Sequence, residues 1–305
     1  MQAIRVDSFG GSEVLRFHET PEPRAGAQEI RVRVEFVGLN PMDWVLSSNP
    51  EVAAALGVSL PSGFGTDFAG VVDEVGDDVD GFDVGDHVFG GATARAAADW
   101  LVVHPGRDTV LRTPAGIGAD VASTLSVAGS TADAALAVIG VGAGDTVLIG
   151  GASGGVGVFA VQLAALAGAR VIGTASESTF DFVRKVGAEP VAYGAGLAER
   201  VRVIAPEGVT AATCLVGTET IGAALELGVA PERISAIAAG PNPPGGIRAT
   251  GGAEASPGAL ERIAAMVASG RINVPIAATY PFEQIRDAVD LQRDGHVHGK
   301  VVVRL

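Results

Sequence analysis

The stretch from Asp145 to Ser176 constrains the fold of this chain more than any other part of it. It opens with an apolar run at 146–149, rich in β-branched residues, which predicts a buried strand. A glycine-dense turn at 150–157 follows, then apolar residues at helical spacing over 158–167 and a second apolar run over 170–174. Strand, turn, helix and strand form a βαβ unit of about 30 residues, the size of one dinucleotide-binding half of a doubly wound sheet.

The glycine turn has the pattern of a pyrophosphate-binding loop. A pyrophosphate lies against backbone N–H groups at a helix N-terminus, where the helix dipole favours negative charge and side chains would hold the backbone away. The usual fingerprint is G-x-G-x-x-G, and its first glycine is here Ala152. The alternative is a glycine-rich turn that only packs a helix against a strand. The residues expected to touch a dinucleotide are Ser153, Gly154, Gly155, Val156 and Gly157.

Composition excludes several classes of protein. The net charge of −14 argues against a nucleic-acid partner or an anionic membrane surface. Cys214 is the only cysteine, which excludes an internal disulfide and a cysteine cage for zinc. No uninterrupted apolar run reaches the roughly 18 residues of a membrane span. The first ten residues lack the pattern of a signal peptide. We therefore expect a cytoplasmic protein with no membrane partner.

The 305 residues predict about two domains. Residues 1–124 carry alternating strand patterns separated by Gly, Pro and Asp clusters, which indicate a barrel-like β domain. Residues 125–250 alternate strand and helix patterns, which predict an α/β domain with a doubly wound parallel sheet. Residues 251–305 are expected to return and complete the first domain. We also expect four further elements: a helix that begins at Ser130, a strand over 247–250, a helix over 258–269 and a last strand over 301–305.

Five short motifs follow one another along the chain. They are NPMDW at 40–44, GTDFAGVV at 65–72, VGDHVFG at 84–90, the glycine turn at 150–157 and GKVV at 299–302. In this order they resemble the medium-chain dehydrogenase/reductase superfamily, and within it the zinc-free quinone oxidoreductase branch, the zeta-crystallin-like enzymes. The resemblance runs from Met1 to Leu305. It implies a Rossmann domain inserted into a GroES-like catalytic domain.

The residues do not suit a catalytic zinc ion, which needs about three protein ligands from Cys, His and Asp or Glu. Zinc alcohol dehydrogenases carry Gly-His-Glu in the first-domain motif, where this chain has Gly-Thr-Asp at 65–67. Asn40 stands where a cysteine would be needed, and Asp67 is interpreted as structural. His296 and His298 alternate near a strand and could chelate in principle, although surface or turn positions are the simpler interpretation. We expect no metal.

Alignment to the family pattern predicts NADPH as the cofactor. An NAD enzyme places Asp or Glu near the end of the second strand to bind the ribose 2′-hydroxyl, and that slot is here Ala175. A small residue leaves room for a 2′-phosphate, to which Ser176 can donate a hydrogen bond. Tyr193 matches a family position that lines this phosphate, or else is a half-buried strand tyrosine. Residues 177–180 depart from the pattern, because related enzymes often have Arg or Lys there.

The resemblance also implies positioning residues beside the nicotinamide. Asn40 and Asp43 hold such positions, and Asn40 could hydrogen-bond the substrate carbonyl or the nicotinamide ribose. The alternatives are a cap of the turn for Asn40 and a helix-start cap for Asp43. Thr131 matches a family threonine near the nicotinamide and its phosphate, although a helix cap at Ser130 explains part of the same sequence.

Three further residues are expected to contact the cofactor. Lys300 belongs to the closing motif and could face the cofactor, or it could be a solvated lysine at the start of a strand. Gly217 and Ala239 follow the ends of successive predicted strands. Their backbone is expected to touch the nicotinamide ribose, because the carboxyl ends of parallel strands meet at one edge of the sheet.

These features together predict an NADPH-dependent reductase of a quinone or an α,β-unsaturated carbonyl. Without zinc, no Lewis acid lowers the pKa of an alcohol, whereas a quinone or an enone is already electrophilic and mainly needs positioning. Two alternatives stay open: an enoyl-thioester reductase of the same superfamily, and a non-catalytic NADPH-binding protein with a structural or regulatory role. Members of the family often dimerise by pairing the outer strands of their nucleotide-binding domains. The corresponding strand is here expected near 247–250, so a homodimer is expected.

Overall fold

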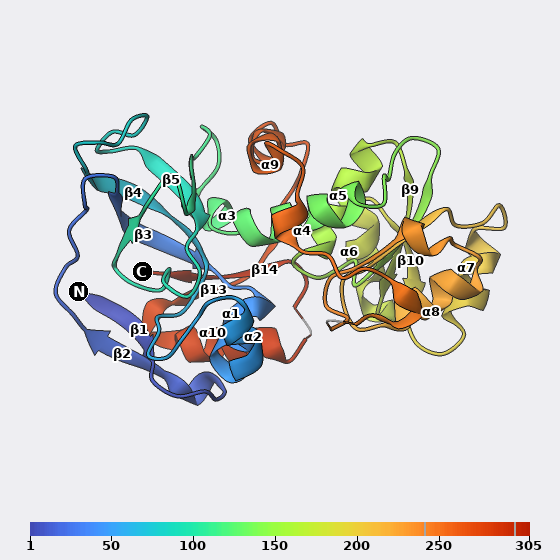
Figure 1. Ribbon diagram of the computed structural model, residues 1–305. Helices are drawn as coiled ribbons and strands as arrows, with labels where there is room; N and C mark the ends of the chain where they lie inside the picture. The colour runs from blue at the N-terminus through green and yellow to red at the C-terminus, as the bar shows by residue number, and fades with distance from the viewer. Residues whose placement is uncertain (241, 296) are drawn as a thin grey trace. The chain divides into compact units, whose positions relative to one another are not determined.

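The computed structural model describes residues 1–240, 242–295 and 297–305 and divides into two compact units (Figure 1). Unit 1 comprises Met1–Val127, Ala264–Ser269 and Ile276–Leu305. Unit 2 comprises Ala128–Ile263 and Gly270–Pro275. The first boundary therefore lies after residue 127 rather than after the expected residue 124, and 251–263 and 270–275 belong to unit 2 rather than to the first domain.

Unit 2 is built on a five-stranded parallel sheet with the strand order β10-β9-β8-β11-β12. The chain starts at the central strand β8, moves outward to β9 and β10, and then crosses to β11 on the other side, so the predicted doubly wound sheet is confirmed. The strands are β8 (Thr146–Gly150), β9 (Arg170–Ala175), β10 (Glu189–Ala192), β11 (Ala211–Cys214) and β12 (Ile234–Ala236). The helices between them are α5 (Gly157–Leu166), α6 (Phe180–Lys185), α7 (Leu197–Ile204) and α8 (Glu219–Glu226).

The central strand explains why this sheet could be predicted from sequence. Leu148 and Ile149 are adjacent in β8 and point to opposite faces, yet both are fully buried. A parallel sheet is covered by helices on both faces, so its strands are continuous apolar runs. The helix α9 (Ala259–Ala268) was also predicted, within one residue at each end.

Two predicted elements of this region are wrong. The expected strand at 247–250 is only an isolated parallel bridge between Ala236 and Ala249. Gly245 and Gly246 precede it with positive φ angles, so the chain is still turning where the strand should begin. The expected helix start at Ser130 is also wrong, because α4 runs over Ser126–Ala137. Pro241, which precedes the segment 247–250, lies outside the described residues.

Unit 1 is built on a seven-stranded, mostly antiparallel sheet with the order β13-β14-β3-β4-β5-β7, and β6 pairs with β3. The last segment does return to this unit, since β14 pairs with β3. The strands are β3 (Ile30–Gly38), β4 (Asp67–Val75), β5 (His87–Gly91), β6 (Trp100–Val103), β7 (Thr109–Arg112), β13 (Ile276–Pro281) and β14 (Lys300–Arg304), beside a hairpin of β1 (Gln2–Val6) and β2 (Leu15–Glu19). The helices wholly in this unit are α1 (Pro41–Ser48), α2 (Pro50–Ala55), α3 (Ala119–Ala122) and α10 (Ile285–Arg293).

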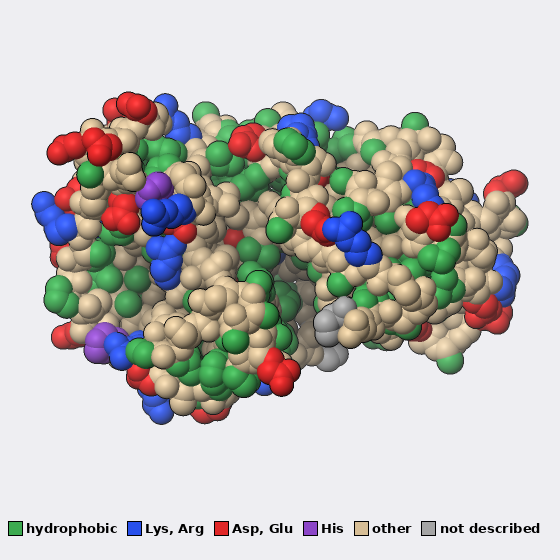
Figure 2. Space-filling view, in the orientation of Figure 1, with side chains coloured by type: hydrophobic (Ala, Val, Ile, Leu, Met, Phe, Trp, Pro, Cys, Tyr) green, Lys and Arg blue, Asp and Glu red, His purple; other side chains and the backbone are tan. Residues whose placement is uncertain are grey.

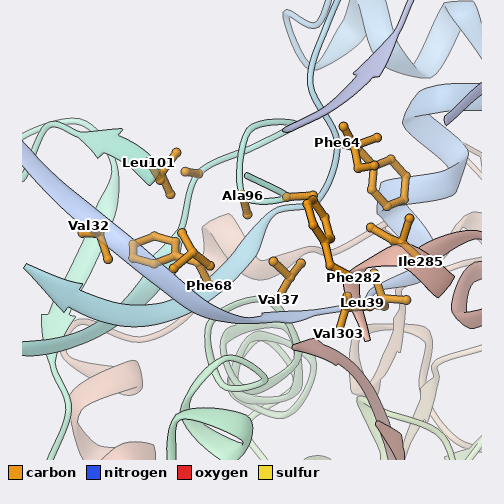
Figure 3. Packing of buried hydrophobic residues seen from close by; sticks show 14 of the residues in the cluster. Val32, Val37, Leu39, Phe64, Phe68, Ala96, Leu101, Phe282, Ile285 and Val303 are labelled. Atoms are coloured by element: carbon orange, nitrogen blue, oxygen red, sulfur yellow. The ribbon is translucent and has the colours of Figure 1, made fainter. Parts of the chain in front are cut away.

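Figure 3 shows the apolar core of unit 1, which joins residues from the two ends of the chain. Val32, Val37 and Phe68 come from β3 and β4, whereas Ile285 and Val303 come from α10 and β14. Residues 276–305 thus complete this core. One part of the surface of this unit is acidic: Figure 2 shows Asp and Glu side chains over the connection between β4 and β5, where Asp77, Asp78, Asp80 and Asp83 are exposed.

None of the helices within the described ranges combines the length and the hydropathy that crossing a membrane requires.

Replacing Phe68 by alanine should lower the free energy of unfolding by about 3–5 kcal/mol, because the ring is fully buried and its removal leaves a cavity. The two tryptophans, Trp44 and Trp100, both lie in unit 1, so their fluorescence during urea unfolding reports on this unit. The matched control is Val84→Ala, at a side chain that is 67% exposed. A loss below about 1 kcal/mol for Phe68→Ala, the range of an ordinary substitution, would contradict this account of the core.

Candidate functional site

Most of the residues predicted to bind a cofactor gather at one edge of the sheet in unit 2. The strands of this sheet are parallel, so their carboxyl ends lie together, and ligands bind there at the point where the strand order reverses. That point is beside β8. The turn at 151–156 follows β8, Ala175 ends β9, Tyr193 follows β10, Gly217 follows β11 and Ala239 follows β12.

The glycine turn offers hydrogen-bond donors that no group in the described part of the chain uses. Within the described residues, the N–H groups of Ser153, Gly155, Val156 and Gly157 have no hydrogen-bond partner. No side chain caps the N-terminus of α5. The turn itself is anchored, because the N–H of Gly151 donates to Oγ1 of Thr174. An anchored turn with free donors at the positive end of a helix suits an anion such as a pyrophosphate.

The glycines of the turn have different reasons to be glycine. A Cβ on Gly157 would lie 2.2 Å from the carbonyl oxygen of Gly151, so close packing of the helix on the turn excludes a side chain. A Cβ on Gly154 would meet nothing nearer than 3.4 Å, which is ordinary contact. The packing of the fold therefore does not require glycine at 154.

The structure also explains why alanine replaces the first glycine of the fingerprint. Ala152 is fully buried and faces Gly173 of β9, where an added Cβ would lie 2.6 Å from that of Ala152. The glycine at 173 leaves room for the methyl group of Ala152. The departure from the fingerprint is compensated and does not argue against a dinucleotide.

The end of β9 carries a group of hydroxyls. Ala175 is buried, and Oγ of Ser176 lies 3.0 Å from Oγ of Ser178 and 3.1 Å from Oγ1 of Thr179. Glu177, between them in sequence, is exposed. The predicted donor Ser176 is thus one of three hydroxyls that lie together.

Tyr193 is 58% exposed, so the alternative of a half-buried strand tyrosine is wrong. Arg200 of α7 holds the loop that carries it: the guanidinium donates to the carbonyl oxygens of Ala192, Gly194 and Ala195 at 3.0, 2.7 and 2.7 Å. Sequence analysis did not identify Arg200. It lies one helix turn beyond the loop, and nothing in the local pattern distinguishes it from a surface arginine.

The remaining predicted residues of unit 2, Gly217, Ala239 and Thr131, differ in exposure and position. Gly217 is exposed with a φ of +60° and open space around it, whereas Ala239 is partly buried. Val216 was not predicted, yet it is 62% exposed and reaches within 3.0 Å of where a Cβ on Gly151 would lie. Thr131 lies inside α4, so it is not part of a helix start, and its Oγ1 borders Gly252.

Unit 1 brings the other predicted residues together in a buried polar cluster. Lys300 at the start of β14 is 3% exposed, so the solvated-lysine alternative is wrong. Its Nζ donates to the carbonyl oxygen of Leu39 at 3.1 Å and to Oδ1 of Asn40 at 2.6 Å. Nδ2 of Asn40 donates in turn to Oδ2 of Asp67 at 3.0 Å and to the carbonyl oxygen of Gly38 at 3.3 Å.

The side chain of Asn40 is therefore engaged inside the protein. Both hydrogens of its amide are donated to groups of unit 1, which leaves none for the carbonyl of a substrate. Asp43 is the third residue of α1, and its Oδ2 accepts the N–H of Asn40 at 2.8 Å. Asp43 therefore caps the start of α1, as the alternative interpretation expected. Asn40 is the residue immediately before this helix.

Burial dominates the ionisation of this cluster. It raises the pKa of Asp43 to about 6, against the Thr66 hydroxyl, the Asn40 N–H and the Lys300 ammonium. It raises the pKa of Asp67 to about 7, against Lys300 and the Asn40 amide. Burial lowers the pKa of Lys300, and the two carboxylates act in the opposite direction.

The cluster does not fit a zinc ion. Asn40 and Asp67 stand at positions that hold ligands or their neighbours in zinc dehydrogenases, but here the Lys300 ammonium lies against Oδ1 of Asn40. A built-in cation repels a second one, and an amide is a poor zinc ligand. Among the residues that the structure describes, no three His, Cys, Asp or Glu side chains are grouped to hold a metal. His296 lies outside the described residues.

Comparison with known proteins gives two matching family models. The alcohol dehydrogenase GroES-like domain matches residues 26–205, and the zinc-binding dehydrogenase model matches residues 186–303. A chloroplastic quinone-oxidoreductase QR1 from Triphysaria versicolor is 37% identical over 207 residues, which are 63% of this chain and 60% of the relative. The chain thus matches less than two thirds of the length of that relative.

Solved structures match over the whole chain. A quinone oxidoreductase from Coxiella burnetii superposes with a TM-score of 0.86 at 29% identity, covering 100% of this chain and 99% of that one. A mycobacterial protein whose structure contains NADPH superposes with a TM-score of 0.86 at 28% identity, covering 100% of both chains.

Replacing Lys300 by methionine should lower the free energy of unfolding at pH 7 by about 3–5 kcal/mol, because it leaves Asp67 and Asp43 buried without their counter-charge. The control is Lys185→Met, which changes the only other lysine of the chain, an exposed residue at the end of α6. Urea unfolding followed by tryptophan fluorescence measures both. Equal, small losses for the two variants would mean that the buried ammonium is not needed.

Proposed function

Because the chain belongs to the medium-chain dehydrogenase/reductase superfamily, in its quinone oxidoreductase branch, we propose that it is an NADPH-dependent, zinc-independent oxidoreductase. The hydride acceptor is a quinone or an α,β-unsaturated carbonyl. The observation that carries this proposal is the row of unused N–H groups where β8 passes into α5. Partly exposed donors at the positive end of a helix are open to an anionic ligand.

The residues of unit 2 fit a dinucleotide. The N–H groups of Ser153, Gly155, Val156 and Gly157 hold the pyrophosphate, and the absence of a side chain at Gly154 lets it approach the backbone. The exposed Tyr193 and Val216 offer apolar surfaces to the adenine and ribose ends at the same edge. Arg200 keeps the loop of Tyr193 in place. When bound there, the reduced nicotinamide supplies the hydride.

The end of β9 favours NADPH over NADH. Ala175 offers no carboxylate to a ribose 2′-hydroxyl and leaves space beside the hydroxyls of Ser176, Ser178 and Thr179. The hydroxyls of Ser176 and Ser178 can donate to phosphate oxygens, whereas that of Thr179 donates to the carbonyl oxygen of Ser176. The mycobacterial relative that was solved with NADPH supports the same choice. Glu177 lies next to these hydroxyls, and no Arg or Lys is adjacent to it in sequence. The preference for NADPH over NADH should therefore be smaller than in an enzyme with an arginine at this place.

Reduction of the acceptor needs little from unit 1 beyond placement. In the described part of unit 1, the buried polar groups Asn40, Asp67 and Lys300 already bond to one another. We therefore assign them to holding the start of α1 and not to moving a proton to the product. The proton that the reduced acceptor needs is taken from water. The homodimer and the cytoplasmic location stay predictions.

The purified chain should oxidise NADPH steadily when 9,10-phenanthrenequinone or 1,2-naphthoquinone is added, and should bind NADPH at least about tenfold more tightly than NADH, a difference of about 1.4 kcal/mol. Absorbance of the reduced cofactor measures turnover, and fluorescence titration measures binding. Faster turnover of a crotonyl thioester than of the quinones would favour the enoyl-thioester reductase instead. Binding without turnover of any acceptor would favour the non-catalytic alternative. Equal or tighter binding of NADH would overturn the cofactor assignment.

Two glycine variants separate ligand binding from packing. Gly154→Ala should change the free energy of unfolding by no more than about 0.5 kcal/mol, because a Cβ fits there, yet weaken NADPH binding about tenfold or more. Gly157→Ala should cost about 1–3 kcal/mol of stability, because its Cβ would collide with the backbone of Gly151. Urea unfolding and cofactor titration are measured on both. Unchanged NADPH binding in Gly154→Ala would refute the proposed pyrophosphate site.

A further inference from the structure

The guanidinium of Arg200 lies at the edge of unit 2 where the predicted cofactor residues gather. The side chain starts from α7 and reaches back to the end of β10, where it donates to the carbonyl oxygens of Ala192, Gly194 and Ala195. Ala192 is paired with Ala175, the last residue of β9, in the parallel register of the two strands. Because neighbouring strands lie about 4.8 Å apart, the positive charge is held close to the hydroxyls that follow β9.

Arg200 keeps its positive charge without a direct acidic partner. No carboxylate oxygen of the described residues lies within 4.0 Å of its guanidinium. Other arginines of unit 2 do form such ion pairs: Arg170 with Glu189, Arg184 with Asp181, Arg202 with Glu226, Arg233 with Asp145, Arg248 with Glu254 and Arg262 with Asp133. The carbonyl oxygens that hold Arg200 carry only partial charges. In a chain with a net charge of −14, such a cation is open to an anionic ligand.

Part of the hydrogen-bonding capacity of Arg200 is also unused. A guanidinium has five N–H groups. Three of them donate to the loop, one from each nitrogen, which leaves one N–H on Nη1 and one on Nη2 without an acceptor in the described chain. The residue is only partly buried, so part of its surface is open to a ligand. The fixed fork of a guanidinium suits the oxygens of a phosphate, so phosphate is the chemistry that fits this group.

The loop that holds Arg200 is itself held by a second side chain. The N–H of Gly194 donates to Oε1 of Glu219, the first residue of α8, at 2.5 Å. Gly194 and Gly196 have φ angles of +99° and +77°, which glycine adopts without strain. Because Glu219 and Arg200 both bond to this short loop, the guanidinium is fixed in place before a ligand binds. Such preorganisation lowers the entropy that binding costs.

Arg200 can replace a cation that the sequence lacks after β9. Residues 177–180 contain no Arg or Lys, and the exposed Glu177 adds a negative charge there. The hydroxyls of Ser176 and Ser178 can donate to a phosphate, but they cannot balance its charge. A guanidinium that is anchored on the neighbouring strand can supply that charge, because the ends of β9 and β10 lie side by side.

We propose that Arg200 selects NADPH over NADH: three of its N–H groups hold the loop of Tyr193, and the other two donate to the 2′-phosphate of the cofactor. This inference rests on the proposed function and names the residue on which the cofactor preference depends. The competing explanation is that Arg200 only holds the loop. A residue that only holds the loop affects NADPH and NADH alike, because both contain the same adenine and ribose, whereas a residue that binds the 2′-phosphate affects NADPH alone.

Arg200→Gln tests this on the full chain. Glutamine keeps a donor for the loop but removes the charge. Fluorescence titrations with NADPH and with NADH give the ratio of their dissociation constants for wild type and variant. We expect the variant to bind NADPH about tenfold or more weakly than wild type, and NADH within about threefold, so that the preference falls by at least about threefold. Arg202→Gln, on the same helix and paired with Glu226, is the matched control and should leave the ratio unchanged.

Arg200→Lys is the second variant. It keeps the charge but cannot hold three carbonyl oxygens as a guanidinium does, so it should weaken binding of both cofactors and keep more of the preference than Arg200→Gln. Equal weakening of NADPH and NADH in Arg200→Gln would mean that Arg200 only holds the loop, and a variant that does not fold would mean that its role is structural; either result overturns the proposal. If the preference is lost in Lys185→Gln instead, the charge has been assigned to the wrong residue. A wild type that binds neither cofactor refutes the proposed function itself, whereas a wild type that prefers NADPH, with the same preference in Arg200→Gln, refutes only the role of Arg200.

Discussion

The ammonium group of Lys300 is the constraint on which unit 1 depends. It lies in the last strand, at the start of β14, and donates to Leu39 and Asn40, so it ties the end of the chain to the residues that precede α1. A buried ammonium needs acceptors and a counter-charge. Asn40 supplies an oxygen to Lys300 and a donor to Asp67, and Asp67 supplies the charge. The identities of these three residues are therefore not independent of one another.

The parts that sequence predicted are those whose signals are local. The turn, its two strands and α5 lie within about 30 residues, the span of a single βαβ unit, and the observed bounds differ from the predicted ones by a residue. Asn40 and Lys300 were named separately, from motifs near the two ends of the chain. The hydrogen bond between them joins positions 260 residues apart, so no local pattern indicated it. Lysine is also rarely fully buried, so burial of Lys300 against Asn40 was not expected.

The wrong or missing elements depend on tertiary contacts in the same way. The helix α4 begins at Ser126 because the carboxylate of Asp67 accepts the N–H of Val127, so the cap of this helix comes from another strand and not from Ser130. The strand β2 was not predicted, because its alternation of apolar Leu15 and Phe17 with polar residues is only four residues long. The short strands β6 and β7 are four residues each, too short for a periodic signal.

The cluster around Lys300 and the glycine turn differ in whether their hydrogen-bond donors have acceptors within the chain. We assign different roles to the two regions on this basis. Around Lys300, the donors of Asn40 end on acceptors of the same unit, so these residues hold the structure. At the glycine turn, the methyl group of Ala152 fits because Gly173 opposite it has no side chain. Gly154 has room for a methyl group and has none, beside N–H groups without partners in the described chain. The packing of the chain therefore does not account for glycine at this position, and the proposed pyrophosphate site does.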